Sequence, residues 1–150
     1  MKVLIVFLGL LTLFSSTVFY QSDMGRYTRG LVFMKTLAEE CAAGAALYFD
    51  EEAYADGRLV FNKGEGTEYI EYILADTKLP YELKTGEKPS YEVLFYDDDS
   101  GYGQMIYGFG AVHSPSVLVK LSVHIDDVFR LPFLSVTSIE RQAMYELPEP

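Results

Sequence analysis

The hydrophobic pattern begins with an uncharged run of 18 residues, Val3 to Tyr20. A helix needs about 20 apolar residues, with ~17 as the lower limit, to cross a hydrocarbon core ~30 Å thick. The run is therefore just long enough to span a bilayer. We expect residues 1–22 to form a membrane anchor, that is, a signal segment that is not cleaved. The apolar residues expected to form this anchor are Val3, Leu4, Ile5, Val6, Phe7, Leu8, Leu10, Leu11, Leu13 and Phe14.

A cleaved secretory signal is the alternative for this segment. Such a signal has an apolar core of ~7–15 residues and ends in a small-x-small cleavage site. The run here is longer, Ser15 and Thr17 make a poor small-x-small pair, and bulky Phe19 follows. The pattern favours the anchor and leaves cleavage open.

Helical periodicity continues beyond the run, and no proline occurs before Pro80. We expect one helix from about Val3 to about residue 49, which at 1.5 Å per residue is ~65–70 Å long. A helix of this length is longer than the core of the small soluble part that follows (the head) requires. It is typical of a helix that supports the head outside the membrane or of an assembly element. The apolar or small residues on the helical period are Met24, Tyr27, Leu31, Met34, Ala38, Cys41, Ala42 and Ala45.

Small residues in the distal part of this helix form a seam, which we define as Ala38, Cys41, Ala42 and Ala45. Small side chains at spacings of three and four let another backbone approach closely. The seam is interpreted first as the seat of the protein's own sheet, and alternatively as a contact with a neighbouring subunit.

After the helix, a connector with a short helix is expected at 50–90, with Thr67 as a candidate N-cap and a short strand at Arg58 to Phe61. From Tyr91 the period changes to two, which predicts a sheet at 91–147. Its strands are expected at about 91–95, 105–109, 117–125 and 135–147. The fold class is therefore α+β, with a long N-terminal helix packed on an antiparallel sheet of about four strands. We expect residues 23–150 to form a single soluble domain.

The composition excludes several kinds of partner and site. A net charge of −10 repels phosphate backbones, so no nucleic acid partner is expected. The single Cys41 excludes an internal disulfide and a multi-cysteine metal site.

Catalytic chemistry finds little support in the sequence. Asp97, Asp98 and Asp99 are interpreted as a solvated hairpin turn, with a weak cation site as the alternative, because they lack the spacing and the bidentate Glu of a calcium loop. His113 and His124 lack zinc-ligand spacing, and no G-x-S-x-G motif occurs. We expect no enzyme activity, no cofactor, no metal and no small-molecule substrate.

Two segments of the helix resemble the TadE/TadG-like pseudopilins of the tight-adherence (Tad/Flp) pilus system. Asp23-Met24-Gly25-Arg26-Tyr27 is similar to their Asp/Glu-x-Gly-Arg segment, and Leu37 to Ala46 to their alanine-rich stretch. The order of a strand at Val117 to Ile125, a connector with Pro132 and a last strand also resembles the family. Unlike pilin-type proteins, this chain has no acidic residue between Met1 and Gln21, so their processing and Glu-mediated registration are not carried over.

The resemblance implies a pilin-like fold and a non-enzymatic, membrane-anchored pseudopilin or minor pilin-type subunit of a Tad-type pilus or related secretion filament. It implies a bacterial cell-envelope location with an extracytoplasmic head, a role in adhesion, and other pilin subunits, assembly machinery and the membrane as partners. The positive-inside rule by itself weakly favours the opposite orientation, with the head in the cytoplasm, because Arg26, Arg29 and Lys35 follow the run. The alternative function is a secreted or tethered ligand-binding module with a surface of Tyr91, Tyr96, Tyr102 and Tyr107.

Overall fold

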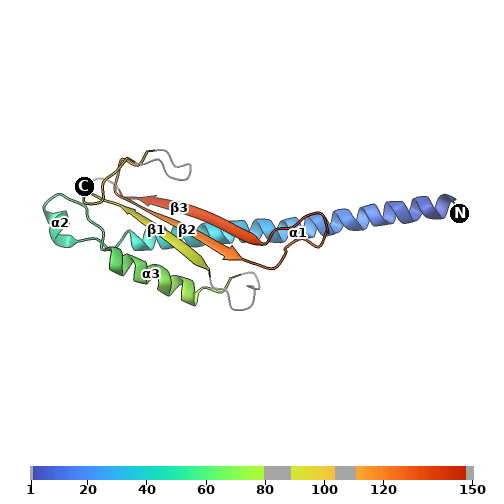
Figure 1. Ribbon diagram of the computed structural model, residues 1–150, viewed down its shortest axis with the longest axis horizontal. Coiled ribbons are helices and arrows are strands. Elements are labelled where there is room, and N and C mark those ends of the chain that lie inside the picture. Colours follow the sequence, from blue (N-terminus) through green and yellow to red (C-terminus); the bar gives the residue numbers. More distant parts are fainter. Residues whose placement is uncertain (1, 80–88, 104–110, 148–150) are drawn as a thin grey trace.

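The computed structural model describes residues 2–79, 89–103 and 111–147. Along the chain these residues form a long helix, two further helices and then strands (Figure 1). The elements are α1 (Lys2–Ala45), α2 (Glu51–Ala55), α3 (Lys63–Asp76), β1 (Ser90–Tyr96), β2 (Ser116–His124) and β3 (Ser138–Glu146).

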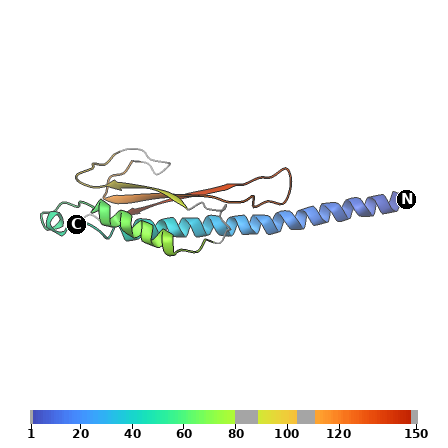
Figure 2. The same cartoon turned by 60° about the horizontal axis from the view of Figure 1, so that its bottom comes forward.

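The helix α1 is 44 residues long and spans about 66 Å. Its N-terminal half projects away from the rest of the molecule as a bare rod, and its C-terminal half is the spine of the head (Figures 1 and 2). No residue of α1 before Asp23 is buried. From Gly30 onward, buried residues recur every three or four positions, which is the stripe of a helix with one face in a core.

Three hydroxyl side chains in the projecting half donate to carbonyl groups of the helix itself. Thr12 donates to the carbonyl of Leu8 at 2.8 Å, and Ser16 donates to the carbonyl of Thr12 at 2.9 Å. Thr17 does the same towards Leu13 at 2.9 Å. Because these donors need no water, they do not prevent the segment from entering an apolar phase.

The described strands form one antiparallel sheet in the order β1-β2-β3. Val119 at the centre of β2 lies opposite Val93 of β1 and opposite Ala143 of β3. The α+β class is thus confirmed, with three strands in the described residues rather than about four. The strand expected at 105–109 lies outside the described residues.

The core lies between one face of the sheet and the C-terminal half of α1, with α3 alongside (Figure 2). Alternate residues of β2 point towards α1, since successive side chains of a strand point to opposite faces. The β2 residues in this core are Val117, Val119, Leu121 and Val123, and each is at most 2% exposed.

Several local predictions need correction. The helix α1 ends at Ala45 rather than near 49, because Phe49 bridges to Phe61 and Asp50 accepts N–H donors as the N-cap of α2. The segment Arg58 to Phe61 forms only that one bridge and not a strand.

The short helix in the connector also begins earlier than predicted. Asn62, not Thr67, is the N-cap of α3, and its side chain accepts from the N–H of Glu65. Thr67 lies inside the helix, where its hydroxyl donates to the carbonyl of Lys63. The prediction was wrong because Gly64 and Gly66, which have low helix propensity, lie in the first turn of α3.

Candidate functional site

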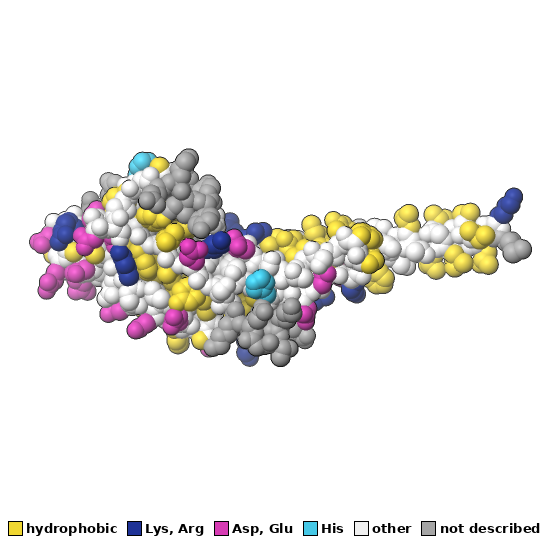
Figure 3. Space-filling model, viewed as in Figure 1, with side chains coloured by type: hydrophobic (Ala, Val, Ile, Leu, Met, Phe, Trp, Pro, Cys, Tyr) yellow, Lys and Arg dark blue, Asp and Glu magenta, His cyan; other side chains and the backbone are white. Residues whose placement is uncertain are grey.

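The predicted anchor residues all lie on the projecting half of α1 and are exposed. The ten residues predicted for the anchor, from Val3 to Phe14, are between 49% and 83% exposed. Within the described residues, α1 is long and apolar enough to cross a membrane, a property that an N-terminal signal sequence shares. Figure 3 shows this rod of hydrophobic side chains beside a head that carries many acidic ones.

The seam residues, in contrast, lie inside the head. Ala38, Cys41, Ala42 and Ala45 are each 0% exposed and belong to the core with β2 and β3. Burial raises the pKa of the Cys41 thiol to about 12, so the thiol is protonated at neutral pH. The small side chains leave the room that the sheet needs to approach α1.

We expect replacement of Ala42 by leucine to destabilise the head. Three extra carbons must fit where the sheet contacts α1, and such overpacking costs about 1–3 kcal/mol. Thermal unfolding of the full-length chain in mild detergent measures the loss. Ala75→Leu is the matched control, because Ala75 is exposed on α3. An Ala42→Leu head as stable as the control would contradict a close-packed seam.

The acidic turn after β1 is built into the head rather than solvated throughout. Asp97 is 0% exposed, and its carboxylate accepts from the N–H of Phe61 at 3.2 Å and of Ser100 at 2.6 Å. Asp98 accepts from the N–H of Leu59 at 2.7 Å. The solvated-turn prediction is therefore wrong for Asp97, because the turn ties the 59–61 segment to the end of β1.

Each carboxylate of this turn also has its own cationic or hydroxyl partner. Lys63 Nζ lies 3.7 Å from Asp97 and donates to Ser100, while Arg58 lies 3.5 Å from Asp99. Among the residues that the structure describes, no group of three or more His, Cys, Asp or Glu side chains is arranged to hold a metal ion. The turn thus acts as a structural clasp.

The most elaborate polar contact lies where α1 leaves the apolar run. Asp23 is 0% exposed, and one of its oxygens accepts from Arg130 Nε at 3.0 Å and Nη2 at 2.7 Å. Its other oxygen accepts from the backbone N–H of Arg130 at 3.0 Å. The hydrogen bonds of Arg130 hold the pKa of Asp23 below its ordinary value, so Asp23 is ionised at neutral pH.

Aromatic side chains lie beside this ion pair. The Arg130 guanidinium lies 5.1 Å from the centre of the Phe19 ring, and the Phe129 ring lies 6.3 Å from that of Tyr20. Tyr27 contacts Phe129 from the next turns of α1, at 6.0 Å between ring centres. We call this set (Phe19, Tyr20, Asp23, Tyr27, Phe129 and Arg130) the helix–loop junction.

The sequence pattern missed the junction. Asp23 was noted only as part of a short segment, and Arg130 was not singled out, because 107 positions separate them. A local signal existed only for Asp23, a lone carboxylate just after an apolar run. Its partner cannot be identified without knowing that the β2–β3 loop folds back along α1.

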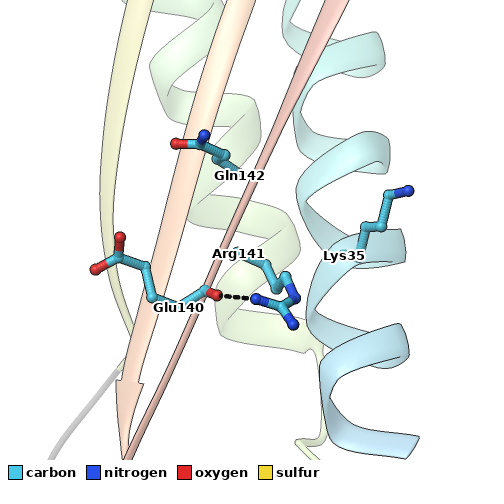
Figure 4. Close-up of a pocket in the computed structure, with 4 residues that line it drawn as sticks. All are labelled: Lys35, Glu140, Arg141 and Gln142. Atoms are coloured by element: carbon cyan, nitrogen blue, oxygen red, sulfur yellow. Dashed lines mark hydrogen bonds between the residues drawn. The ribbon is translucent and has the colours of Figure 1, made fainter. Parts of the chain in front are cut away.

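A shallow depression between α1 and β3 is lined by Lys35, Glu140, Arg141 and Gln142 (Figure 4). Arg141 donates to the carbonyl of Glu140 at 3.0 Å, and Lys35 pairs with Glu39 at 3.7 Å. Glu140 is in turn paired with Lys120 at 3.0 Å. These four lining residues offer no nucleophile beside a general base.

The remaining candidate residues do not converge. His113 and His124 are exposed at opposite ends of β2. Tyr91 and Tyr96 lie on opposite faces of β1, because they are an odd number of residues apart. The Tyr91 hydroxyl donates to Glu71 at 2.7 Å. Tyr107 lies outside the described residues, so the proposed tyrosine surface is not assembled on one face by the residues that are described.

No family model, no curated protein and no solved structure matches this chain. Its function is therefore inferred from the geometry of α1, the head and the helix–loop junction.

Proposed function

We propose that this protein is a non-enzymatic, membrane-anchored subunit for assembly of a Tad-type pilus or related secretion filament. In this proposal α1 spans the membrane through Val3 to Tyr20 and the head lies on the extracytoplasmic side. The observation that carries the proposal is the unbroken helix, which runs from an exposed apolar rod into the core of the head. A rod of this kind is stable in lipid, whereas in water it would leave large apolar side chains uncovered.

The continuity of α1 also supports a role in assembly. The head is attached to the rod by the same helix that forms its core, so a force or displacement applied to the rod is transmitted to the head without a flexible linker. The motif resemblance at Asp23 to Tyr27 and at Leu37 to Ala46 supports the pilus system as the setting.

We expect charge in the rod to abolish anchoring. The double variant Leu8→Arg and Leu11→Arg places two charges in the apolar run, each costing about 2.5–3.5 kcal/mol at the centre of a membrane helix. The matched control is Leu8→Val with Leu11→Val. Carbonate extraction of cell membranes should leave the wild type and the control in the pellet and release the arginine variant.

The pilus setting is tested separately in the source cells. Deletion of the gene should remove the surface filaments, and the wild-type gene should restore them while the arginine variant does not. Filaments that persist in the deletion strain would contradict the assembly role even if the protein is anchored. Release of the intact wild-type chain into the soluble fraction would contradict the anchor, and mass measurement of the chain decides whether the segment is cleaved.

A further inference from the structure

The β2–β3 loop presents an apolar side chain to the outside. Phe133 is 75% exposed, more than any other large hydrophobic side chain outside the Val3–Tyr20 run among residues 2–79, 89–103 and 111–147. Pro132 beside it is exposed, while Leu131 and Leu134 are half-buried. We call residues 131–134 the loop tip. A single exposed apolar residue is common on protein surfaces and does not by itself indicate a contact. Whether Phe133 makes one therefore depends on where the loop tip lies.

The loop tip is held in one shape by hydrogen bonds. At the neck of the loop the Asp127 carboxylate accepts from the N–H of Phe129 at 3.0 Å and of Val136 at 3.1 Å. At the tip, the N–H of Leu134 donates to the carbonyl of Leu131 at 3.1 Å. These bonds connect the two sides of the loop and close the turn that carries Phe133.

The helix–loop junction places the tip next to the end of the apolar run. Arg130 lies against Phe19, and Phe129 lies against Tyr20, which are the last two residues of the run. Both views show the β2–β3 loop projecting past the end of the sheet along α1, towards the N-terminus (Figures 1 and 2). A bilayer that contains Val3 to Tyr20 therefore has its surface at the level of this loop.

The chemistry of the loop fits that level of a membrane. Aromatic side chains favour the boundary between headgroups and acyl chains, and apolar side chains gain free energy by entering it. Charge adds nothing to this fit, because the Arg130 guanidinium is already paired with Asp23 and the exposed Asp126 and Asp127 lie in the same loop.

We propose that the loop tip is a second, interfacial membrane contact, with Phe133 inserted in the leaflet from which α1 emerges. This inference rests on the proposed function, since it takes α1 as the membrane-spanning helix. One helix alone leaves α1 and the head free to rotate together about the axis of α1. A second contact fixes which face of the sheet points along the membrane and which faces outward.

A depth measurement tests this contact in the full-length chain. A polarity-sensitive fluorophore is attached to Phe133→Cys in phospholipid vesicles that carry a spin label near the headgroup or near the chain end. Leu47→Cys, at an exposed position beyond the end of α1, is the matched control. The native Cys41 is buried, and the wild type controls for its labelling. We expect the 133 probe to emit at shorter wavelength than the 47 probe and to be quenched most by the headgroup spin label.

A third probe separates the two proposals. A label at Leu10→Cys should be quenched most by the chain-end spin label, and its absence from the bilayer would overturn the anchor itself. Quenching at position 10 without quenching at position 133 would overturn only the loop contact. A blue-shifted 133 probe that lipid spin labels do not quench, and that responds to protein density, would assign the tip to a second copy and overturn the lipid assignment.

Discussion

Replacing Leu121 by alanine is expected to cost about 2–5 kcal/mol of unfolding free energy, the range measured for removing a buried leucine side chain. Leu121 is 0% exposed at the centre of the sheet, between Tyr91 of β1 and Arg141 of β3. It lies on the face of β2 that packs on α1. Truncation leaves a cavity between β2 and α1.

Urea unfolding of the full-length chain in mild detergent measures this loss. The near-ultraviolet circular dichroism of the tyrosines reports the packing of the head, and the denaturation midpoint should fall with little change in the slope. Leu47→Ala is the matched control, because the same atoms are removed at a site that is 69% exposed. Equal stability of the two variants would mean that the sheet is not packed on α1 in solution.

The elements with strong periodicity could be predicted from the sequence. The alternation of Val117 to Ile125 indicated a strand with one apolar face, and the structure has β2 there with that face in the core. The apolar run and the seam likewise predicted α1, because the helical period appears in the residues themselves. Boundaries were less accurate, since α1 ends where Phe49 and Asp50 make contacts that a period does not encode.

The contacts that tie distant segments together could not be predicted. Asp23 and Arg130 lie 107 positions apart, and Asp97 and Phe61 lie 36 apart. The sequence around a carboxylate does not show whether the carboxylate is buried, because the three-dimensional fold determines which group becomes its partner. This is why Asp97 was assigned to solvent and why Arg130 was overlooked.

The two buried carboxylates have related roles in the fold. Asp23 fixes the β2–β3 loop to the middle of α1, and Asp97 fixes the segment before α3 to the end of β1. Both accept backbone N–H groups, and both are paired with a cation, Arg130 at Asp23 and Lys63 at Asp97. Each therefore ties together two segments that lie far apart in the sequence.

Loss of the Asp97 carboxylate is expected to lower the free energy of unfolding by about 2–3 kcal/mol. Hydrogen bonds to charged groups contribute about 1.5–3 kcal/mol to stability, and buried donors left without acceptors add to the loss. In Asp97→Ala the N–H of Phe61 loses its acceptor in the core, and the N–H of Ser100 loses its own. The matched control is Asp99→Ala in the same turn. Asp99 is paired with Arg58 at an exposed site, where ion pairs contribute ~0–1 kcal/mol.

The pH dependence distinguishes a lost carboxylate from general damage. Burial alone would raise the pKa of Asp97, but its hydrogen bonds from Ser100 and Phe61 and the charge of Lys63 lower it below the ordinary 3.8. A folded-state pKa below the unfolded value gives stability that is complete above pH 3.8 and is lost as the pH falls towards the folded pKa. The midpoint of urea unfolding should therefore fall less steeply with acid in Asp97→Ala than in the wild type.

Some acid sensitivity should remain in that variant. The pKa values of Asp23 and Asp127 are also lowered, mainly by hydrogen bonds from Arg130 and from the N–H of Phe129 respectively, and both groups are intact. If Asp97→Ala is as stable as Asp99→Ala and loses stability in acid as steeply as the wild type, Asp97 does not hold the 59–61 segment to the sheet, and the clasp assigned to the acidic turn is wrong.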